Sequence, residues 1–282
     1  MVEQIDAHHH FWRYSAAEYS WIGQEMEQLR RDFLVTDLKP EMASADVHGV
    51  LTVQARQTIE ETTWLLCLAS QCSFVRGVVG WAPIASPEFP RQLEPLIENR
   101  KLKGLRHVLQ DELDDAYMLR PGFQRGISAL RGTGLVYDVL VHERQLPTVA
   151  HLVDCHPIQI FVLDHLGKPK IRDREFSPWR EHLRELGQRP NVYCKLSGMA
   201  TEADWKNWTT DDLRPYFEIA LECFGPGRLL AGSDWPVCNV ATSYRRWWHT
   251  LRELVSALSL PEQGGILGGN AKRVYNLEGE TK

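Results

Sequence analysis

The sequence predicts an α/β fold, a single (β/α)8 TIM barrel that forms one domain over residues 1–282. Three observations support this prediction. Short apolar, β-branched runs recur eight times along the chain, segments with helical spacing lie between them, and the length suits a barrel built as one unit. Strands that alternate with helices at a regular spacing form a parallel sheet, and eight such units close into a barrel.

Each expected strand is an apolar run that ends in polar residues. In order along the chain, the eight runs span 4–10, 49–55, 75–83, 102–110, 134–142, 158–167, 191–199 and 228–236.

The expected helices have apolar residues spaced three and four apart, as at Leu93, Leu96 and Ile97. Pro or Asp opens several of these segments and Gly closes others, as expected at helix ends. Residues 18–48 are too long for a simple helix, so we expect a helix and an excursion over the barrel mouth there, and a C-terminal helix after the last strand. The other helices are expected at 61–72, 88–101, 121–132, 145–156, 178–188, 212–225 and 243–258.

The first strand argues against the main alternative, an open doubly wound sheet. That fold predicts a Gly-rich phosphate-binding turn after the first strand. Here the first strand ends in three histidines, within IDAHHHFW at 5–12. The barrel is therefore the better prediction.

Composition excludes several classes of partner. The formal net charge of −5 argues against nucleic acid or an acidic membrane surface. No apolar run approaches the roughly 18 residues of a membrane span, and no signal-peptide pattern opens the chain. The six cysteines are scattered and form no CxxC pair, which fits a reducing cytoplasm. We expect a small-molecule partner, and the sequence leaves assembly into a homo-oligomer open.

Polar residues mark the end of every expected strand, and chemistry in such barrels sits at the carboxyl ends of the strands. A shared pocket explains this pattern better than eight unrelated structural roles. The residues are His8 and His10, Gln54, Trp81, Arg106 and His107, Asp138 and His142, Asp164 and His165, Lys195 and Ser197, and Asp234.

Three of these residues suggest a metal site. His8 and His10 are two apart on a strand, so their side chains face one way while that of His9 faces the other. In a barrel, Asp234 at the end of the eighth strand lies beside the first strand. Two imidazoles and a carboxylate form a three-ligand set that leaves a position for water, as in a catalytic metal site.

Five stretches form a recognisable set of motifs: DAHHHFW (6–12), LDHLGKP (163–169), LSGM (196–199), GSDWP (232–236) and GNAKRVYNL (269–277). With these motifs the chain resembles the amidohydrolase superfamily, and within it the sugar-lactone hydrolases that act on L-fuconolactone or L-rhamnonolactone. The motifs extend over essentially the whole chain.

The resemblance implies roles for particular residues. His8 and His10 correspond to the first-strand metal pair, His165 to the sixth-strand histidine, Asp234 to the aspartate that activates water, and Arg106 to a cation that holds substrate. The chain departs from the binuclear pattern, since no lysine ends its fourth or fifth strand and Lys195 belongs to the seventh. We therefore expect one divalent ion, with zinc as the first choice. Similar lactonases hydrolyse their substrates without a bound ion, and if this chain behaves in the same way its ion is dispensable.

Other residues suggest a neutral, polyhydroxylated substrate. Indole rings stack on the apolar faces of sugars, so Trp12, Trp81 and Trp235 are candidates for substrate binding. His107, Asp138 and Lys195 could bind hydroxyl groups, and the sequence does not decide whether Asp138 or His142 is the fifth-strand pocket residue. Only Arg106 is placed to bind a carboxylate, which argues against a dicarboxylate substrate.

These observations predict a lactonase in which Asp234 is the general base and His165 or Arg106 stabilises the developing oxyanion. Two alternatives remain on the same fold, a metal-dependent decarboxylase and a pyrone-dicarboxylate lactonase. A third alternative, a non-catalytic metal-binding protein, would explain the histidine run but not Asp234 and His165, which lie far away in the sequence.

Overall fold

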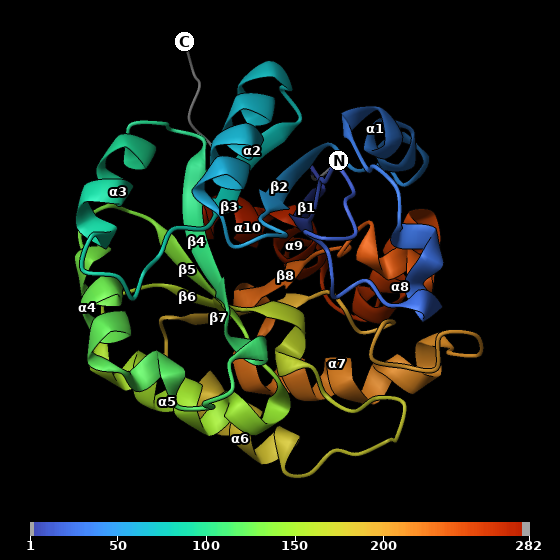
Figure 1. Ribbon diagram of the computed structural model, residues 1–282. Helices are drawn as coiled ribbons and strands as arrows, with labels where there is room; N and C mark the ends of the chain where they lie inside the picture. Colours follow the sequence, from blue (N-terminus) through green and yellow to red (C-terminus); the bar gives the residue numbers. More distant parts are fainter. Residues whose placement is uncertain (1–2, 278–282) are drawn as a thin grey trace.

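Eight parallel strands form the centre of the fold and are neighbours in the order β1 to β8 (Figure 1). The computed structural model describes residues 3–277. The strands are β1 Ile5–His9, β2 Gly49–Val53, β3 Val75–Gly80, β4 Leu102–Val108, β5 Val136–Leu140, β6 Phe161–Leu163, β7 Val192–Leu196 and β8 Leu229–Ala231.

The sheet closes on itself between β1 and the segment that follows β8. The amide of His10 donates to the carbonyl of Trp235 over 2.6 Å, and the amide of Asp234 donates to the carbonyl of His8 over 2.7 Å. These bonds join β1 to the segment after β8, beside the residues predicted to form the metal site. The predicted barrel is therefore confirmed.

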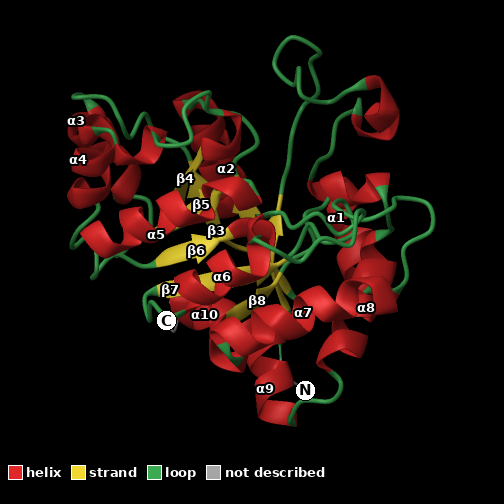
Figure 2. Cartoon of the chain, turned by 90° about the horizontal axis from the view of Figure 1, so that it is seen from below, coloured by secondary structure: helices red, strands yellow, loops and turns green. Residues whose placement is uncertain are grey.

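Helices surround the strands, as a view from below also shows (Figure 2). Local sequence explains several helix ends: the Thr58 side chain accepts the Glu61 amide at the start of α2, and the Ser243 side chain accepts the Arg246 amide at the start of α8. The helices between strands are α1 Val35–Ser44, α2 Ile59–Gln71, α3 Phe89–Ile97, α4 Pro121–Ala129, α5 Leu146–Cys155, α6 Trp179–Gly187 and α7 Thr210–Phe224, and α8 Tyr244–Val255 follows β8.

The segment between β1 and β2 contains α1 and an irregular excursion, as predicted. The excursion includes a short 3-10 segment at Gln24–Leu29, and an antiparallel bridge between Trp12 and Phe33 joins its two ends. After α8 come α9 at Leu260–Gly264 and α10 at Asn270–Val274, so the predicted C-terminal helix is present.

Two apolar layers hold the barrel together. The larger layer lies between strands and helices, and the smaller one fills the barrel interior, where Tyr275 packs with inward residues such as Leu51, Val136 and Val162. Inward positions recur every second residue along a strand. Asp138 and Asp164 therefore follow Val136 and Val162 on the inner face, one layer closer to the carboxyl ends of the strands.

Several strands are shorter than predicted, and the difference matters at the site. β6 and β8 have only three residues each, so His165 and Asp234 lie in the turns after them. Both residues have left-handed backbone, with φ values of 53° and 59°. This conformation cannot continue a strand, and hydrophobic pattern does not reveal it.

Among the described residues we looked for membrane-spanning helices and for disulfides. No helix among them is both long and apolar enough to cross a membrane. The six cysteines, all within residues 3–277, form no disulfide with one another.

Candidate active site

A β-bulge in β1 sets the direction of the histidines. Asp6 pairs with Val50 and His9 with Thr52, so three steps along β1 match two along β2. The extra residue shifts the alternation, and His8 and His10 then face the interior although Ala7 also packs there. The carboxylate of Asp6 accepts the amide of His8 and both the amide and the hydroxyl of Ser233, which ties the bulge to the end of β8.

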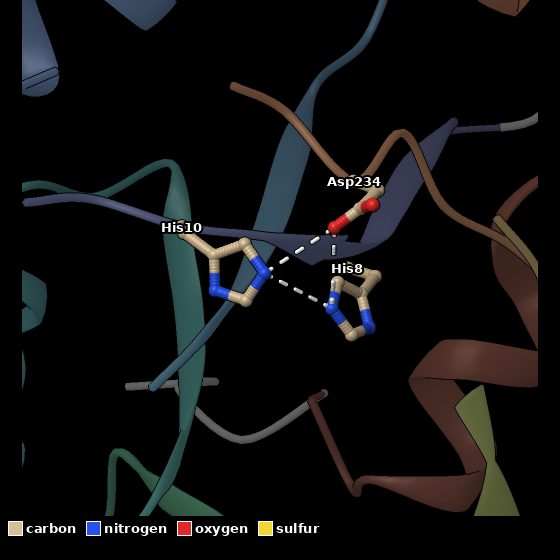
Figure 3. Close-up of side chains that lie close together, drawn as sticks. All are labelled: His8, His10 and Asp234. Carbon is tan, nitrogen blue, oxygen red and sulfur yellow. Dashed lines mark hydrogen bonds and ion pairs between the residues drawn. The ribbon is translucent and has the colours of Figure 1, made fainter. Parts of the chain in front are cut away.

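His8, His10 and Asp234 lie together at the junction of β1 and the chain after β8 (Figure 3). The two Nε2 atoms are 3.2 Å apart. Oδ1 of Asp234 lies 3.3 Å from Nε2 of His10 and 3.7 Å from that of His8. The structure therefore brings together the three residues that the sequence suggested as metal ligands.

The donor set fits one divalent ion. Metal–nitrogen bonds of about 2.0–2.1 Å at tetrahedral angles separate two ligand atoms by roughly 3.3 Å, close to the spacings observed here. Nδ1 of His10 lies 2.8 Å from the carbonyl oxygen of Val53, which can only accept a hydrogen bond. That contact orients the His10 ring and directs Nε2 toward Asp234 and His8, where it can hydrogen-bond the carboxylate or, without a proton, bind a metal.

His165 lies beside this triad, with its ring centroid 4.5 Å from that of His8. Its Nδ1 is 2.8 Å from the hydroxyl of Ser197, and Gly198 lies directly against the ring. Burial lowers the pKa of His165 to about 4 and that of His8 well below its usual range. Burial therefore favours the neutral form of both imidazoles.

Asp234 is ionised in this environment. Burial raises the pKa of its carboxyl, but His165 and a hydrogen bond with His10 outweigh that effect and hold the pKa well below its usual range. The side chain is almost completely buried, so the carboxylate is held among imidazoles with little water around it. Such a group can accept a proton or bind a cation.

Four charged side chains form a layer beneath the triad, and two are cations and two are carboxylates. Lys195 contacts Asp138 closely and lies 2.9 Å from Oδ1 of Asp164, while Nη1 of Arg106 donates to Oδ2 of Asp164 over 2.9 Å. All four side chains are buried, and the two positive charges face the two negative charges inside the barrel. Burial opposes ionisation of Asp164, but Lys195 and then His8 hold its pKa well below the usual range.

This layer answers the question about the fifth strand. Asp138 points inward from β5, where it also accepts the hydroxyl of Tyr275 over 2.7 Å, whereas His142 lies beyond the strand end. Asp138 and Lys195 are fully buried beneath the metal-type triad, and their polar atoms bind each other. They are therefore placed to support the site, not to contact a substrate at its mouth.

Arg106 is also engaged by the protein. Beyond Asp164, its guanidinium donates to the backbone and side-chain oxygens of Gln54, and Nη1 lies 3.4 Å from Nε2 of His8. The cation expected to hold substrate is thus in the site but directly beside the metal-type ligands.

Trp81 is the half-buried one of the three candidate tryptophans. It follows β3, and its indole N–H points to Nδ1 of His107 at 3.3 Å. Nε2 of His107 lies 2.7 Å from a carboxylate oxygen of Glu112, and Tyr117 stacks on the His107 ring. Because both nitrogens of His107 have partners, this residue fixes the indole ring of Trp81 in place.

Trp12 and Trp235 do not contribute a free ring face. The Trp12 ring packs against Tyr19 and Phe33, and its N–H donates to the backbone of the excursion. Trp235 packs edge-on against Phe33 and Phe11. Both rings are 2% exposed or less. They are therefore core residues, and they pack the excursion against the barrel.

The sequence assigned no specific role to several residues that build the site. Asp164, Ser197 and Gln54 were visible as polar strand-end residues, although nothing in the sequence gave their partners. Asp6 and Gly198 lie within the motifs of the resemblance. Tyr275 lies in another of these motifs, but nothing in the sequence indicated its contact with Asp138, which is 137 positions away.

The barrel and its cluster of two histidines and an aspartate define a class of protein, barrel enzymes with possible metal ligands at the carboxyl ends of the strands. The family model for amidohydrolases matches residues 5–277, and the chain belongs to this family.

Two named relatives match this chain over almost their full length. A protein named L-fucono-1,5-lactonase from Burkholderia multivorans is 42% identical over 97% of this chain and 96% of its own. Another of that name, from Burkholderia ambifaria, is 35% identical over 99% and 97% of the two chains. A crystal structure of a Burkholderia multivorans amidohydrolase with bound zinc is 42% identical, has a TM-score of 0.93, and matches over 97% of this chain and 99% of that one. A 2,6-dihydroxybenzoate decarboxylase from Rhizobium, at 15% identity, shares the fold alone.

Proposed function

We propose that this chain hydrolyses the lactone of a six-carbon sugar acid, with L-fucono-1,5-lactone as the first choice and an L-rhamnonolactone as the second. The observation that carries this proposal is the 42% identity to a named L-fucono-1,5-lactonase over nearly the whole of both chains. The clustering of His8, His10, His165 and Asp234 at the carboxyl ends of the strands supports it.

In the proposed reaction, Asp234 accepts a proton from the attacking water and later returns it to the ring oxygen that leaves. Its carboxylate is ionised and buried, so it is ready to act as a base near neutral pH. Burial favours the neutral form of His165, and in the tautomer in which the Ser197 hydroxyl donates to Nδ1, Nε2–H donates to the lactone carbonyl oxygen as negative charge develops there.

His8, His10 and Asp234 are the residues proposed to hold one divalent ion, with zinc as the first choice. A bound ion of this kind lowers the pKa of water and polarises a carbonyl group. The chain's own contribution is to fix the direction of each ligand: Val53 orients His10, and the bulge and Asp6 orient His8.

We expect elemental analysis of the purified protein to find no more than one tightly held metal equivalent per chain. The reason is that Lys195, the lysine nearest the ligands, contacts Asp138 and Asp164 and is not placed as a bridge between two ions. Substituting His10→Asn should remove that equivalent, while the exposed His48→Asn should retain it. Two tightly held equivalents would contradict the mononuclear site.

Substituting Gly198→Ala should reduce turnover by about 10- to 100-fold with the fold retained. The backbone of Gly198 is left-handed, with φ of +68°, and a Cβ there would lie 2.7 Å from Nδ1 of His165. The ring must therefore shift, and small displacements of a catalytic group have effects of this size. Steady-state kinetics and a thermal melt would test this.

The matched control is Gly227→Ala, since a Cβ at Gly227 would meet no atom within 4 Å and the backbone is not left-handed. It should retain full turnover. Full turnover in Gly198→Ala as well would show that the position of His165 does not matter to the reaction.

Replacing Trp81→Ala should raise KM about tenfold and change kcat much less. Its indole is the half-buried one at the site, held by His107, and stacking of an aromatic face contributes on the order of 1 kcal/mol. The matched control is Trp64→Ala on α2, which also removes a half-buried indole and should leave KM unchanged. An unchanged KM in Trp81→Ala would remove this residue from the proposed binding surface.

A screen of aldonolactones with a pH indicator tests the proposed function, because hydrolysis releases an acid. Lactones of 6-deoxy acids should react fastest. Burial of their methyl group contributes about 0.8 kcal/mol, so the 6-hydroxy analogues should be only a few-fold slower. Inert aldonolactones together with turnover of a pyrone dicarboxylate would favour the alternative lactonase, and carbon dioxide release from an aromatic acid would indicate a decarboxylase. Metal binding without turnover of any ester or lactone would indicate a metal-binding protein.

A further inference from the structure

We propose that Lys168 and Glu202 bind one hydroxyl group of the lactone between them, the hydroxyl on the carbon next to the carbonyl. They are then residues that determine the specificity of the site for a hydroxylated lactone. This inference rests on the proposed function and on the role of His165 in it, and it assigns a substrate contact to two residues outside the triad.

A left-handed turn after β6 places Lys168 on the same side as His165. All residues from 165 to 168 have a positive φ, between 53° and 69°, and only Gly167 among them is a glycine. The amide of Lys168 donates to the carbonyl of His165 over 2.8 Å, so side chains 165 and 168 share one face of the turn. Left-handed backbone is costly for residues other than glycine, and such strained segments cluster at functional sites.

The loop after β7 brings Glu202 to Lys168. The amide of Glu202 donates to the carbonyl of Gly198 over 3.2 Å, and the carbonyl of Glu202 accepts the amide of Arg172 over 2.9 Å. These backbone bonds fix Glu202 against the loop that carries Lys168. Gly198 also lies against the ring of His165, so both loops border the same histidine.

The two side chains form a loose ion pair beyond the carboxyl ends of β6 and β7. Nζ of Lys168 lies 3.8 Å from Oε1 of Glu202, and the two side chains are only 20% and 27% exposed. This distance is longer than a direct hydrogen bond, whereas a hydroxyl oxygen about 2.8 Å from each atom bridges them. Such a hydroxyl donates to the carboxylate and accepts from the ammonium, so both charged groups gain a partner.

Electrostatic effects indicate that this pair lies beside the proposed reacting groups. Burial raises the pKa of Glu202, Lys168 lowers it, and the carboxylate of Asp234 raises it again. Burial also lowers the pKa of His165, and the Lys168 ammonium adds to that effect. When His165 binds the lactone carbonyl, the hydroxyl on the neighbouring carbon is the one closest to this pair.

Kinetics with L-fucono-1,5-lactone and its 2-deoxy analogue test the contact. In the wild type, kcat/KM for the analogue should be lower by about tenfold or more, because the analogue lacks a hydroxyl bound by charged groups. Glu202→Gln and Lys168→Met should each lower kcat/KM for the parent lactone about tenfold and leave that for the analogue almost unchanged. A merely structural role would lower both values equally.

Glu175→Gln is the matched control, since Glu175 also pairs with a lysine, Lys170 at 3.3 Å, but its side chain is 53% exposed. It should retain wild-type kinetics with both lactones. Equal losses for the two lactones in Glu202→Gln and Lys168→Met, or no loss in either variant, would overturn the hydroxyl contact. Equal rates for the two lactones in the wild type would also contradict the contact and leave the proposed function standing. If the wild type hydrolysed neither lactone, the proposed function would fail and this inference with it.

Discussion

The substitution Asp234→Asn should reduce turnover of L-fucono-1,5-lactone by about 10³-fold or more while the protein stays folded. Asparagine keeps the volume of the side chain but cannot accept the proton of the attacking water, and loss of a general base costs about 10²–10⁴-fold. The change also removes the negative charge of a proposed metal ligand, 3.3 Å from Nε2 of His10. Steady-state kinetics and circular dichroism would measure the two effects.

An exposed carboxylate supplies the control. Asp211→Asn, at a side chain 90% exposed in α7, should retain wild-type turnover. Activity of Asp234→Asn within about tenfold of the wild type would exclude Asp234 as the base, since a general base contributes at least about 10²-fold.

The largest expected effect on stability comes from Lys195→Met. This change leaves two buried carboxylates, Asp138 and Asp164, with Arg106 as the cation of the layer. Loss of one partner of a buried ion pair costs about 3–5 kcal/mol of unfolding free energy, because an uncompensated charge remains in the interior. Urea unfolding should show the loss as a lower midpoint.

The double variant Lys195→Met with Asp138→Asn restores the charge balance and should recover at least half of the lost stability. The half-exposed Lys170→Met, in a surface pair with Glu175, should leave the midpoint unchanged. If Lys195→Met were as stable as the wild type, the layer would not be the balanced ionic network that its distances indicate.

The sequence predicted the barrel because its signals are local and repeated. Strand and helix periods alternate along the chain, and closure of the sheet then brings Asp234 beside His8. The His-x-His spacing predicted that both histidines face one way, which is the case. It could not predict the bulge between Asp6 and His9, which directs them inward.

The sequence could not show how deep within the barrel each polar side chain lies. Asp138 and Lys195 end strands like the other candidates, yet they lie beneath the triad and bind each other. Trp12 also follows a strand, but the excursion covers its ring. Such outcomes depend on which distant segment packs against a residue, as the contact of Tyr275 with Asp138 illustrates.

The initial rate of L-fucono-1,5-lactone hydrolysis, measured with wild-type protein and corrected for spontaneous ring opening, tests the central claim most directly. We expect a kcat/KM of at least about 10⁴ M⁻¹s⁻¹, the lower end of the usual range for enzymes acting on their own substrates. A rate no higher than spontaneous opening, in protein that is folded and supplied with zinc, would contradict the assignment of this chain as a sugar lactonase.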